Sequence, residues 1–318
     1  MTLVDEQKDI KSIFTEKIAK HLYKYYWQEL GLGDWESRIQ DKISEVSRNK
    51  EILKTAESFI GSLRDKRVLI VGSGWGGACV AAKHLRAEEV IGIDIDDEVN
   101  EIGNLRMQLE GYKECCLYGA AEHIPFADSY FDYVHCFTVL EHVSDVRKSL
   151  SEIIRVVKRG GHVFIQAPSY VRPIEKHYKI PYIPLMPKKL AKMYLRLLKR
   201  PPNFIDSINY IWPHRIKKML SHIKNIEVYD IADEYKNRFA SVNAHADFNH
   251  LLAKSTIVSE KRNIARILLR KILSETLTIF YKTWDFVFGT QEIYFLIHKY
   301  EETVNVFDRK SGTDTNAR

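Results

Sequence analysis

The sequence predicts an α/β fold in which a mostly parallel sheet carries helices on both faces. Residues 66–168 alternate short apolar strand patterns with helical patterns, as chains of βαβ units do. A glycine-rich turn over residues 72–77 joins the first strand directly to a helix. Hydrophobic residues make up 45% and charged residues 28% of the 318 residues, which is ordinary globular usage and allows a core of normal size.

The N-terminal segment, residues 1–64, is expected to be helical and to precede the sheet. Gly31 and Gly33 interrupt the helical pattern, so two helical stretches are predicted. The aromatic residues before this break either pack between helices, which is the simpler interpretation, or cover a pocket. The apolar residues at helical spacing are Ile10, Ile13, Phe14, Ile18, Leu22 and Tyr26, and the aromatic residues are Tyr23, Tyr25, Tyr26 and Trp27.

The central region, residues 65–168, is expected to supply five strands of the sheet. Each strand pattern is short and apolar, and most are followed by a helical pattern. The predicted strands cover residues 66–71, 90–94, 114–118, 130–137 and 162–166. The predicted helices cover residues 76–86, 97–110 and 145–157, and a turn over 158–161 leads into the fifth strand.

The C-terminal region, residues 169–306, lacks the regular alternation of strand and helix patterns. The elements expected here are a proline-rich loop over 173–187, a basic helix over 188–200, a helix over 213–222 and strands over 225–231 and 292–299. The mainly helical residues between these two strands are too many for a simple connection and are expected to form a lid or substrate cap. The polar tail, residues 307–318, is expected to be disordered.

The strongest local motif is VLIVGSGWGG at residues 68–77, which joins a strand to a helix. Glycines let the backbone approach a ligand closely, and the N–H groups at the helix start favour a carboxylate or phosphate. Asp94 ends the next strand, where a carboxylate can accept hydrogen bonds from both ribose hydroxyls. Because the loop also satisfies G-x-G-x-x-G, three interpretations stay open: S-adenosylmethionine, a nicotinamide or flavin dinucleotide, or a tight turn with no ligand.

Four further motifs follow the glycine loop. They are AEHIPF at 121–126, FDYV at 131–134, VLEHV at 139–143 and KRGG at 158–161. In this order the sequence resembles the class I S-adenosylmethionine-dependent methyltransferases, in the group that includes quinone, sterol and glycan methyltransferases. The resemblance is good over residues 66–168 and looser to residue 231. It implies a Rossmann-like sheet of seven mostly parallel strands with the last one antiparallel, and S-adenosylmethionine as cofactor.

The resemblance also implies where individual residues meet the cofactor. The glycine loop would line the methionyl portion, while Asp94 would bind the ribose with Ile95 against the adenine. The pair at 121–122 would border the adenine edge, and the pair at 136–137 would lie beneath the sulfonium. The alternatives are core packing for the apolar residues and a helix N-cap for Asp94. The implied cofactor residues are Gly72, Ser73, Gly74, Gly76, Asp94, Ile95, Ala121, Glu122, Cys136 and Phe137.

Two positions depart from the family pattern. Relatives usually carry an acid where this chain has Ile70, and many carry Asp where it has Ala120. Backbone carbonyls or the nearby Glu122 are the candidate substitutes. The departures leave a non-catalytic methyltransferase-like binding protein as one alternative function, and an NAD-dependent oxidoreductase is the other.

The candidate catalytic residues are Glu141, His142 and His177. Methyl transfer needs an acceptor atom in line with the breaking bond, and a hydroxyl acceptor must also lose a proton to a base. Glu141 and His142 follow the fourth strand, and His177 lies after the fifth with Glu175 and Tyr178. Acceptor contacts are expected there because ligands bind at the carboxyl ends of parallel strands. The alternative for Glu141 and His142 is capping or bonding within their loop.

The acceptor is expected to be a small molecule, and the helix over 188–200 favours a lipid-linked one. This helix mixes lysine and arginine with leucine, and a basic amphipathic helix can lie on a membrane surface. Ordinary packing around a polar pocket is the alternative. A nucleic-acid acceptor is not expected, because 48 Lys+Arg against 42 Asp+Glu give a net charge of only +6.

The remaining features bear on compartment and metals. The four cysteines lack C-x-x-C spacing, and the N-terminus lacks a signal-peptide pattern, so a cytoplasmic protein, membrane-peripheral if the acceptor is lipid-linked, is expected. His245, Asp247 and His250 lack the spacing of a helical ligand pair, so no metal site is expected. The sequence makes no prediction of oligomeric state.

Overall fold

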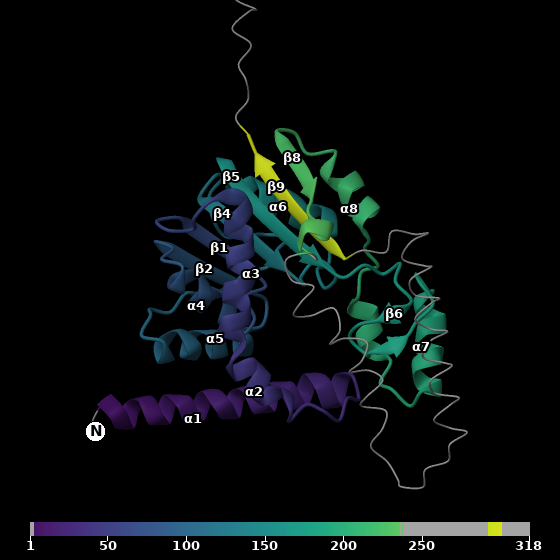
Figure 1. Cartoon of the computed structure of the whole chain (residues 1–318). Coiled ribbons are helices and arrows are strands. Elements are labelled where there is room, and N and C mark those ends of the chain that lie inside the picture. The colour runs from purple at the N-terminus through teal and green to yellow at the C-terminus, as the bar shows by residue number, and fades with distance from the viewer. Residues whose placement is uncertain (1–2, 236, 238–291, 301–318) are drawn as a thin grey trace, which may run out of the picture.

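The computed structural model describes residues 3–235, 237 and 292–300 (Figure 1). The predicted helical cap and the predicted disordered tail, residues 307–318, lie outside the described residues, as do His245, Asp247 and His250. Within the described ranges, no helix is both long and apolar enough to cross a bilayer.

A seven-stranded sheet forms the centre of the described part of the chain, in the order β3-β2-β1-β4-β5-β9-β8. The first five of these strands pair in parallel, and β9 is antiparallel to both of its neighbours. The strands are β1 (Arg67–Val71), β2 (Glu89–Asp94), β3 (Cys116–Tyr118), β4 (Phe131–Phe137), β5 (Val157–Ala167), β8 (Ile226–Asp230) and β9 (Ile293–Lys299). The predicted seven-stranded, mostly parallel sheet with a reversed last strand is confirmed.

Two details of the strand prediction are wrong. The predicted turn over 158–161 lies inside β5, because Phe131 of β4 pairs with Val157 while Tyr133 pairs with His162. The residues of KRGG therefore form a bulge-like irregularity within β5 and do not form a turn before the strand. The predicted loop over 173–187 contains a short antiparallel pair, and its strands are β6 (Ile174–Glu175) and β7 (Ile180–Pro181).

Helices cover both faces of the sheet. One face carries α3, α4 and α5, and the other carries α6 and α8, while α7 lies with β6 on the opposite side of the molecule from α4 and α5 (Figure 1). The helices are α3 (Glu45–Ile60), α4 (Gly77–His84), α5 (Asp97–Leu109), α6 (Val146–Val156), α7 (Lys188–Leu197) and α8 (Pro213–Leu220), with a 3₁₀ turn, η2 (Asn203–Ser207), before α8.

The central strand β1 shows why the two faces are both covered. Leu69 and Val71 pack into the cluster beneath α6, whereas Val68 and Ile70 pack into the cluster beneath α3 and α4. Side chains of a strand alternate between faces, so a strand buried on both sides is apolar throughout. Each such side chain contributes about 1.5–3 kcal/mol by leaving water.

The N-terminal segment packs against the sheet domain and reaches the glycine loop. Helix α1 (Leu3–Leu22) runs past α5 (Figure 1) and continues into a π-helical turn, η1 (Tyr23–Glu29), before α2 (Arg38–Ile43). Arg106 of α5 donates hydrogen bonds to the carbonyls of Trp75 in the glycine loop (2.6 Å) and of Lys42 in α2 (2.7 Å). This guanidinium therefore fixes the N-terminal segment against the loop.

Candidate functional site

The glycine loop lies between β1 and α4 and has the tight geometry that its sequence predicts. Gly72, Gly74 and Gly76 have φ angles of 67°, 52° and 75°, in the left-handed region that residues with a Cβ rarely adopt. The N–H groups of Gly72 and Ser73 both donate to the carbonyl of Ile93, at 2.8 and 3.0 Å. These two bonds hold the start of the loop against the end of β2.

The space beside the loop is empty at one glycine and filled by neighbouring protein atoms at two others. In the described structure, no atom lies within 4 Å of where a Cβ of Gly74 would stand. A Cβ at Gly72 would lie 2.3 Å from Cγ2 of Val139, and one at Gly76 would lie 2.8 Å from the carbonyl oxygen of Gly103. Gly74 therefore presents the space that a ligand needs, while Gly72 and Gly76 are required for packing.

Asp94 faces this opening from the end of β2. One of its carboxylate oxygens accepts from the N–H of Gly74 (3.2 Å) and the other from the N–H of Asp96 (3.2 Å). Burial raises the pKa of Asp94, and the two backbone hydrogen bonds partly oppose that effect. The N-cap of α5 is Asp96, whose side chain accepts from Glu98 and Val99, so the alternative role of Asp94 as that cap is wrong. Ile95 is 63% exposed beside it.

The other implied cofactor residues have more varied surroundings. Ala121 is buried, and the Glu122 carboxylate accepts from the N–H and hydroxyl of Ser144, at 2.5 and 2.6 Å. Partial burial works against ionisation of Glu122, but the bonds from Ser144 outweigh it and lower the pKa of Glu122. Cys136 is fully buried in the core, and Phe137 is half-buried at the end of β4. Glu122 is thus engaged in holding the start of α6.

The two departures from the family pattern also have a structural basis. Ile70 is buried in the cluster beneath α3 and α4, where an unpaired acid would be costly. Ala120 forms a small bridge with His123. An acid from a different element lies close to the loop: Glu45 of α3 would contact a Cβ at Gly77 within 2.6 Å, and it pairs with Arg106 at 3.4 Å. No pattern in the sequence connects Glu45 with the loop.

The three candidate catalytic residues come together although they follow different strands. Glu141 and His142 follow β4, and His177 lies between β6 and β7. One polar side-chain atom from each of the three lies within 4.8 Å of the other two. The rings of His142 and His177 meet edge to face, with centroids 5.0 Å apart. We call these residues the Glu141–His142–His177 cluster.

Burial sets the protonation of this cluster. Glu141 is 1% exposed, and burial raises its pKa to about 7. Burial, with a smaller effect of His177, lowers the pKa of His142 to about 3. His177 Nδ1 lies 2.9 Å from a carboxylate oxygen of the fully buried Glu175 and 3.3 Å from the hydroxyl of Tyr170. The cluster is therefore two imidazoles and a buried carboxylate, with the His142 side chain 34% exposed to solvent.

Aromatic side chains from two other elements lie beside the cluster. Phe204 of η2 lies 5.2 Å from the His177 ring and 5.8 Å from the His142 ring, measured between centroids. Tyr25 of η1 contacts Phe204 at 5.4 Å. The N-terminal aromatic residues thus reach the surroundings of the cluster through Tyr25, whereas helix packing was the simpler interpretation of their sequence. Phe204 and Tyr170 are residues that sequence reasoning missed, because no local pattern connects them with residues 141–142.

Three cysteines form a second cluster beneath the glycine loop. The sulfur atoms of Cys79, Cys115 and Cys116 lie within 4.8 Å of one another, and all three residues are buried. A Cβ at Gly92 would lie 2.6 Å from Cβ of Ser73 and 2.7 Å from Sγ of Cys79. These thiols are free in the described structure, as the sequence predicts, and they support the loop from below.

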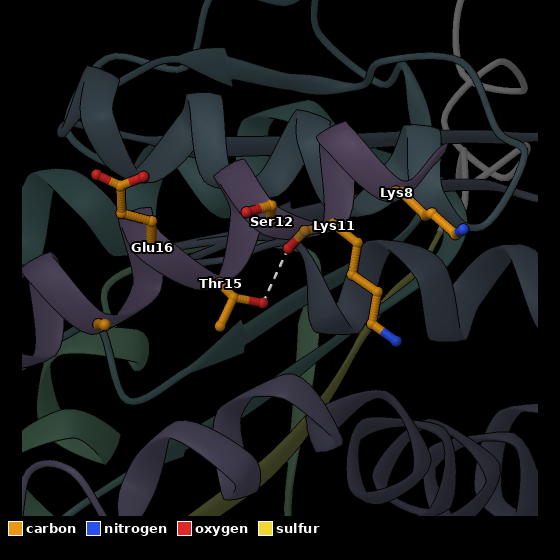
Figure 2. Close-up of a pocket in the computed structure, with 6 residues that line it drawn as sticks. Lys8, Lys11, Ser12, Thr15 and Glu16 are labelled. Carbon is orange, nitrogen blue, oxygen red and sulfur yellow. Dashed lines mark hydrogen bonds between the residues drawn. The ribbon is translucent and has the colours of Figure 1, made fainter. Parts of the chain in front are cut away.

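A shallow hollow on α1 lies apart from both clusters. Figure 2 shows its lining residues, which come from this one helix, with the Thr15 hydroxyl donating to the carbonyl of Lys11 at 2.9 Å. Its volume is about 530 Å³. A face lined by one helix has no convergent polar groups from other elements, and we assign it no role. The lining residues are Lys8, Lys11, Ser12, Thr15, Glu16 and Ala19.

Comparisons with known proteins agree with this geometry. Residues 69–165 match the family model described as "Methyltransferase domain". The methyltransferase YcgJ of Bacillus subtilis is 34% identical over 115 residues, covering 36% of this chain and 44% of that protein. A demethylmenaquinone methyltransferase of Bacteroides fragilis is 30% identical over 115 residues, covering 35% and 47%. A ubiquinone biosynthesis O-methyltransferase of Nitrosomonas europaea is 33% identical over 116 residues, covering 35% and 48%.

The chain spans less than half the length of these relatives. The residues that match the family model include the glycine loop and Asp94. The seven mostly parallel strands with a reversed β9 are what the resemblance implies. Over residues 69–165, the chain is therefore similar to the class I S-adenosylmethionine-dependent methyltransferases, which use S-adenosylmethionine as their cofactor.

Proposed function

We propose that this protein transfers the methyl group of S-adenosylmethionine, in line, to a small-molecule, lipid-like or glycan-linked acceptor. One observation carries the proposal. The open glycine loop after β1 contacts the Asp94 carboxylate at the end of β2, and the Glu141–His142–His177 cluster begins just after β4, the other neighbour of β1. The loop and the cluster are joined through Val139, which packs on Gly72 and lies two residues before Glu141.

The residues around Gly74 fit the cofactor. S-adenosylmethionine, when bound, supplies a methyl group already activated on a sulfonium sulfur. The open space at Gly74 suits its methionyl portion, and Asp94 suits the ribose hydroxyls. We assign Ile95 to the adenine and the backbone at Ala121 and Glu122 to its edge, since the Glu122 carboxylate is engaged by Ser144. We assign Cys136 and Phe137, at the end of β4, to the region beneath the sulfonium.

The Glu141–His142–His177 cluster is assigned to the acceptor. Glu175 holds the His177 ring by its Nδ1 atom, which fixes the ring's orientation. Phe204 and Tyr25 exclude water from the same side. A positioned group of this kind can assist the loss of a hydroxyl proton as the methyl group arrives, an effect typically worth about 10²–10⁴ in rate.

The surface around α7 supports a hydrophobic or lipid-linked acceptor. Leu190, Met193 and Leu197 are exposed on this helix, with Leu197 at 80%. Lysines and arginines alternate with them, which suits an anionic membrane face. Two of the relatives are named for quinone substrates, which are hydrophobic.

Calorimetry with S-adenosylmethionine, S-adenosylhomocysteine and NAD tests the proposal. The expected result is binding of both sulfur nucleosides and no binding of NAD. Binding of NAD alone would favour an oxidoreductase, and binding of none of the three would favour a non-catalytic protein. Transfer of label from S-[methyl-³H]adenosylmethionine into a solvent extract of membrane lipids then tests the acceptor class, and incorporation only into the aqueous phase would refute a lipid-like acceptor.

A further inference from the structure

The Glu141–His142–His177 cluster has the composition of a metal site. It contributes two imidazoles and one carboxylate from two chain segments, and one ligand atom from each residue lies within 4.8 Å of the other two. Ligand atoms around one transition-metal ion, bonded at about 2.0–2.2 Å, lie roughly 3–4 Å apart. Binding an ion would therefore draw these side chains together by about an ångström.

Glu141 lacks the partners that a buried carboxylate needs. Its Oε2 atom has no hydrogen-bond partner in the described part of the chain, and the side chain is 1% exposed. Its Oε1 atom lies 4.0 Å from Nε2 of His142, beyond hydrogen-bond distance. Lys176, the ammonium that acts electrostatically on Glu141, is paired with Glu292. A buried polar atom in this state is normally matched by a water, an ion or a ligand.

His177 is held as a metal-binding histidine usually is. Its Nδ1 atom lies 2.9 Å from the Glu175 carboxylate, and the other oxygen of Glu175 accepts from the N–H of Tyr178 at 2.6 Å. A carboxylate on one ring nitrogen fixes the tautomer and makes the other nitrogen, Nε2, a better ligand. Glu175 is fully buried, so this arrangement is built into the fold and is independent of solvent.

We propose that Glu141, His142 and His177 bind a divalent transition-metal ion of the zinc type, with Glu175 as the positioning residue of His177. Imidazole and carboxylate suit zinc, iron or manganese better than magnesium or calcium, which prefer oxygen ligands alone. Three protein ligands leave a coordination position open for an acceptor oxygen.

The role of the ion rests on the proposed methyl transfer. An acceptor hydroxyl bound to the ion releases its proton to solvent more easily, because the ion stabilises the alkoxide or phenolate. The new oxygen–carbon bond then forms as the carbon–sulfur bond breaks, with its electron pair passing to sulfur. Asp94 and the glycine loop take no part in binding the ion, so metal binding and cofactor binding can be measured separately.

Cobalt(II) titration of the full-length, chelator-stripped protein tests the proposal. Visible d–d absorption reports nitrogen and oxygen ligands, while binding to Cys79, Cys115 and Cys116 would give strong near-ultraviolet thiolate bands instead. The expected result is one equivalent of cobalt with d–d bands, competed by zinc. His142→Ala combined with His177→Ala should remove this equivalent, and Glu175→Gln should weaken it by about 10–100-fold.

His123→Ala is the matched control, because His123 is an exposed histidine outside the cluster. Glu141→Gln keeps the size of the buried side chain and should weaken cobalt at least tenfold, which guards against misfolding of the double variant. An unchanged cobalt titration in both variants, or thiolate bands alone, would overturn the metal site. Binding of S-adenosylhomocysteine, measured on the same samples, decides the proposed function independently.

Discussion

The backbone N–H of Gly74 donates a 3.2 Å hydrogen bond to the carboxylate of Asp94, which joins the glycine loop of one strand to the end of the next. The carboxylate is partly buried, and its other contact is the N–H of Asp96. A ribose placed against Asp94 would add hydroxyl donors to the same oxygens. This contact makes Asp94 the residue on which the cofactor assignment can be tested most directly.

Asp94→Ala should weaken S-adenosylhomocysteine binding by about 1–3 kcal/mol, or roughly 5–150-fold in Kd, because hydrogen bonds to a charged group are lost. Calorimetry measures the change. Asp97→Ala is the control, since Asp97 is an exposed acid in the first turn of α5 and should leave affinity unchanged. Equal affinity for Asp94→Ala and the wild type would refute the ribose assignment.

Gly74→Ala should abolish or strongly weaken cofactor binding while lowering stability by about 1–2 kcal/mol. The added methyl group meets no protein atom within 4 Å in the described structure, so its main effects are backbone strain at φ 52° and occupation of the ligand's space. Gly111→Ala is the matched control, with φ 76° and the same empty surroundings just beyond the end of α5. Thermal unfolding of both variants measures the effect of backbone strain, and calorimetry measures the loss of cofactor binding. Similar cofactor affinity in the two variants would contradict the prediction.

His177→Ala should slow methyl transfer by about 10²–10⁴-fold and leave S-adenosylhomocysteine affinity within a factor of about two. The physical reason is that the role proposed for His177 concerns the acceptor, whereas Gly74 and Asp94 are assigned to the cofactor. Label transfer into lipid extract measures the rate, and His123→Ala serves as the control. If His177→Ala lost S-adenosylhomocysteine affinity as well as rate, the assignment of His177 to the acceptor would be refuted.

Asp132→Asn should destabilise the fold at neutral pH by about 1–2 kcal/mol. Asp132 accepts from the Lys158 ammonium and from the N–H of Arg67, both at 2.8 Å. Partial burial alone would raise the pKa of Asp132, but these two bonds outweigh it and lower the pKa below the usual value.

The sign of the pH effect follows from that lowered pKa. The stability from Asp132 is complete above its unfolded pKa, near 4, and is lost as pH falls through the folded value. The difference between wild type and Asp132→Asn, measured by denaturant unfolding, should therefore shrink below about pH 4. Asp128→Asn is the control, because Asp128 is 77% exposed in its pair with Arg155 and should change stability by less than about 0.5 kcal/mol. A difference that stays constant with pH would show that the charge of Asp132 is not the cause.

Met193→Ser combined with Leu197→Ser should reduce flotation of the protein with anionic liposomes several-fold. Both side chains are exposed on α7 among basic residues, and removing them takes away apolar area that a bilayer would bury. Leu117→Ser is the matched control, since Leu117 is an exposed leucine on β3. No flotation of the wild-type protein would remove the membrane association.

The sequence predicted the sheet, its strand count and its reversed last strand, and it predicted the glycine loop and the role of the cysteines as buried free thiols. These features follow from local patterns: apolar runs, helical periodicity, glycines at a turn and motifs in a fixed order. The same patterns predicted a turn at residues 158–161 before the strand. They describe single segments, so they contain no information about the pairing of β4 with β5, which continues on both sides of these residues.

Only the tertiary structure decided which polar groups meet. It directs the Glu122 side chain to Ser144, makes Asp96 rather than Asp94 the cap of α5, and brings Glu45 beside the loop. It also unites Glu141 and His142 with His177, which the chain carries on a separate hairpin after β5. Side-chain contacts between distant segments depend on strand order and helix packing, and single-sequence periodicity describes only the segment in which it occurs.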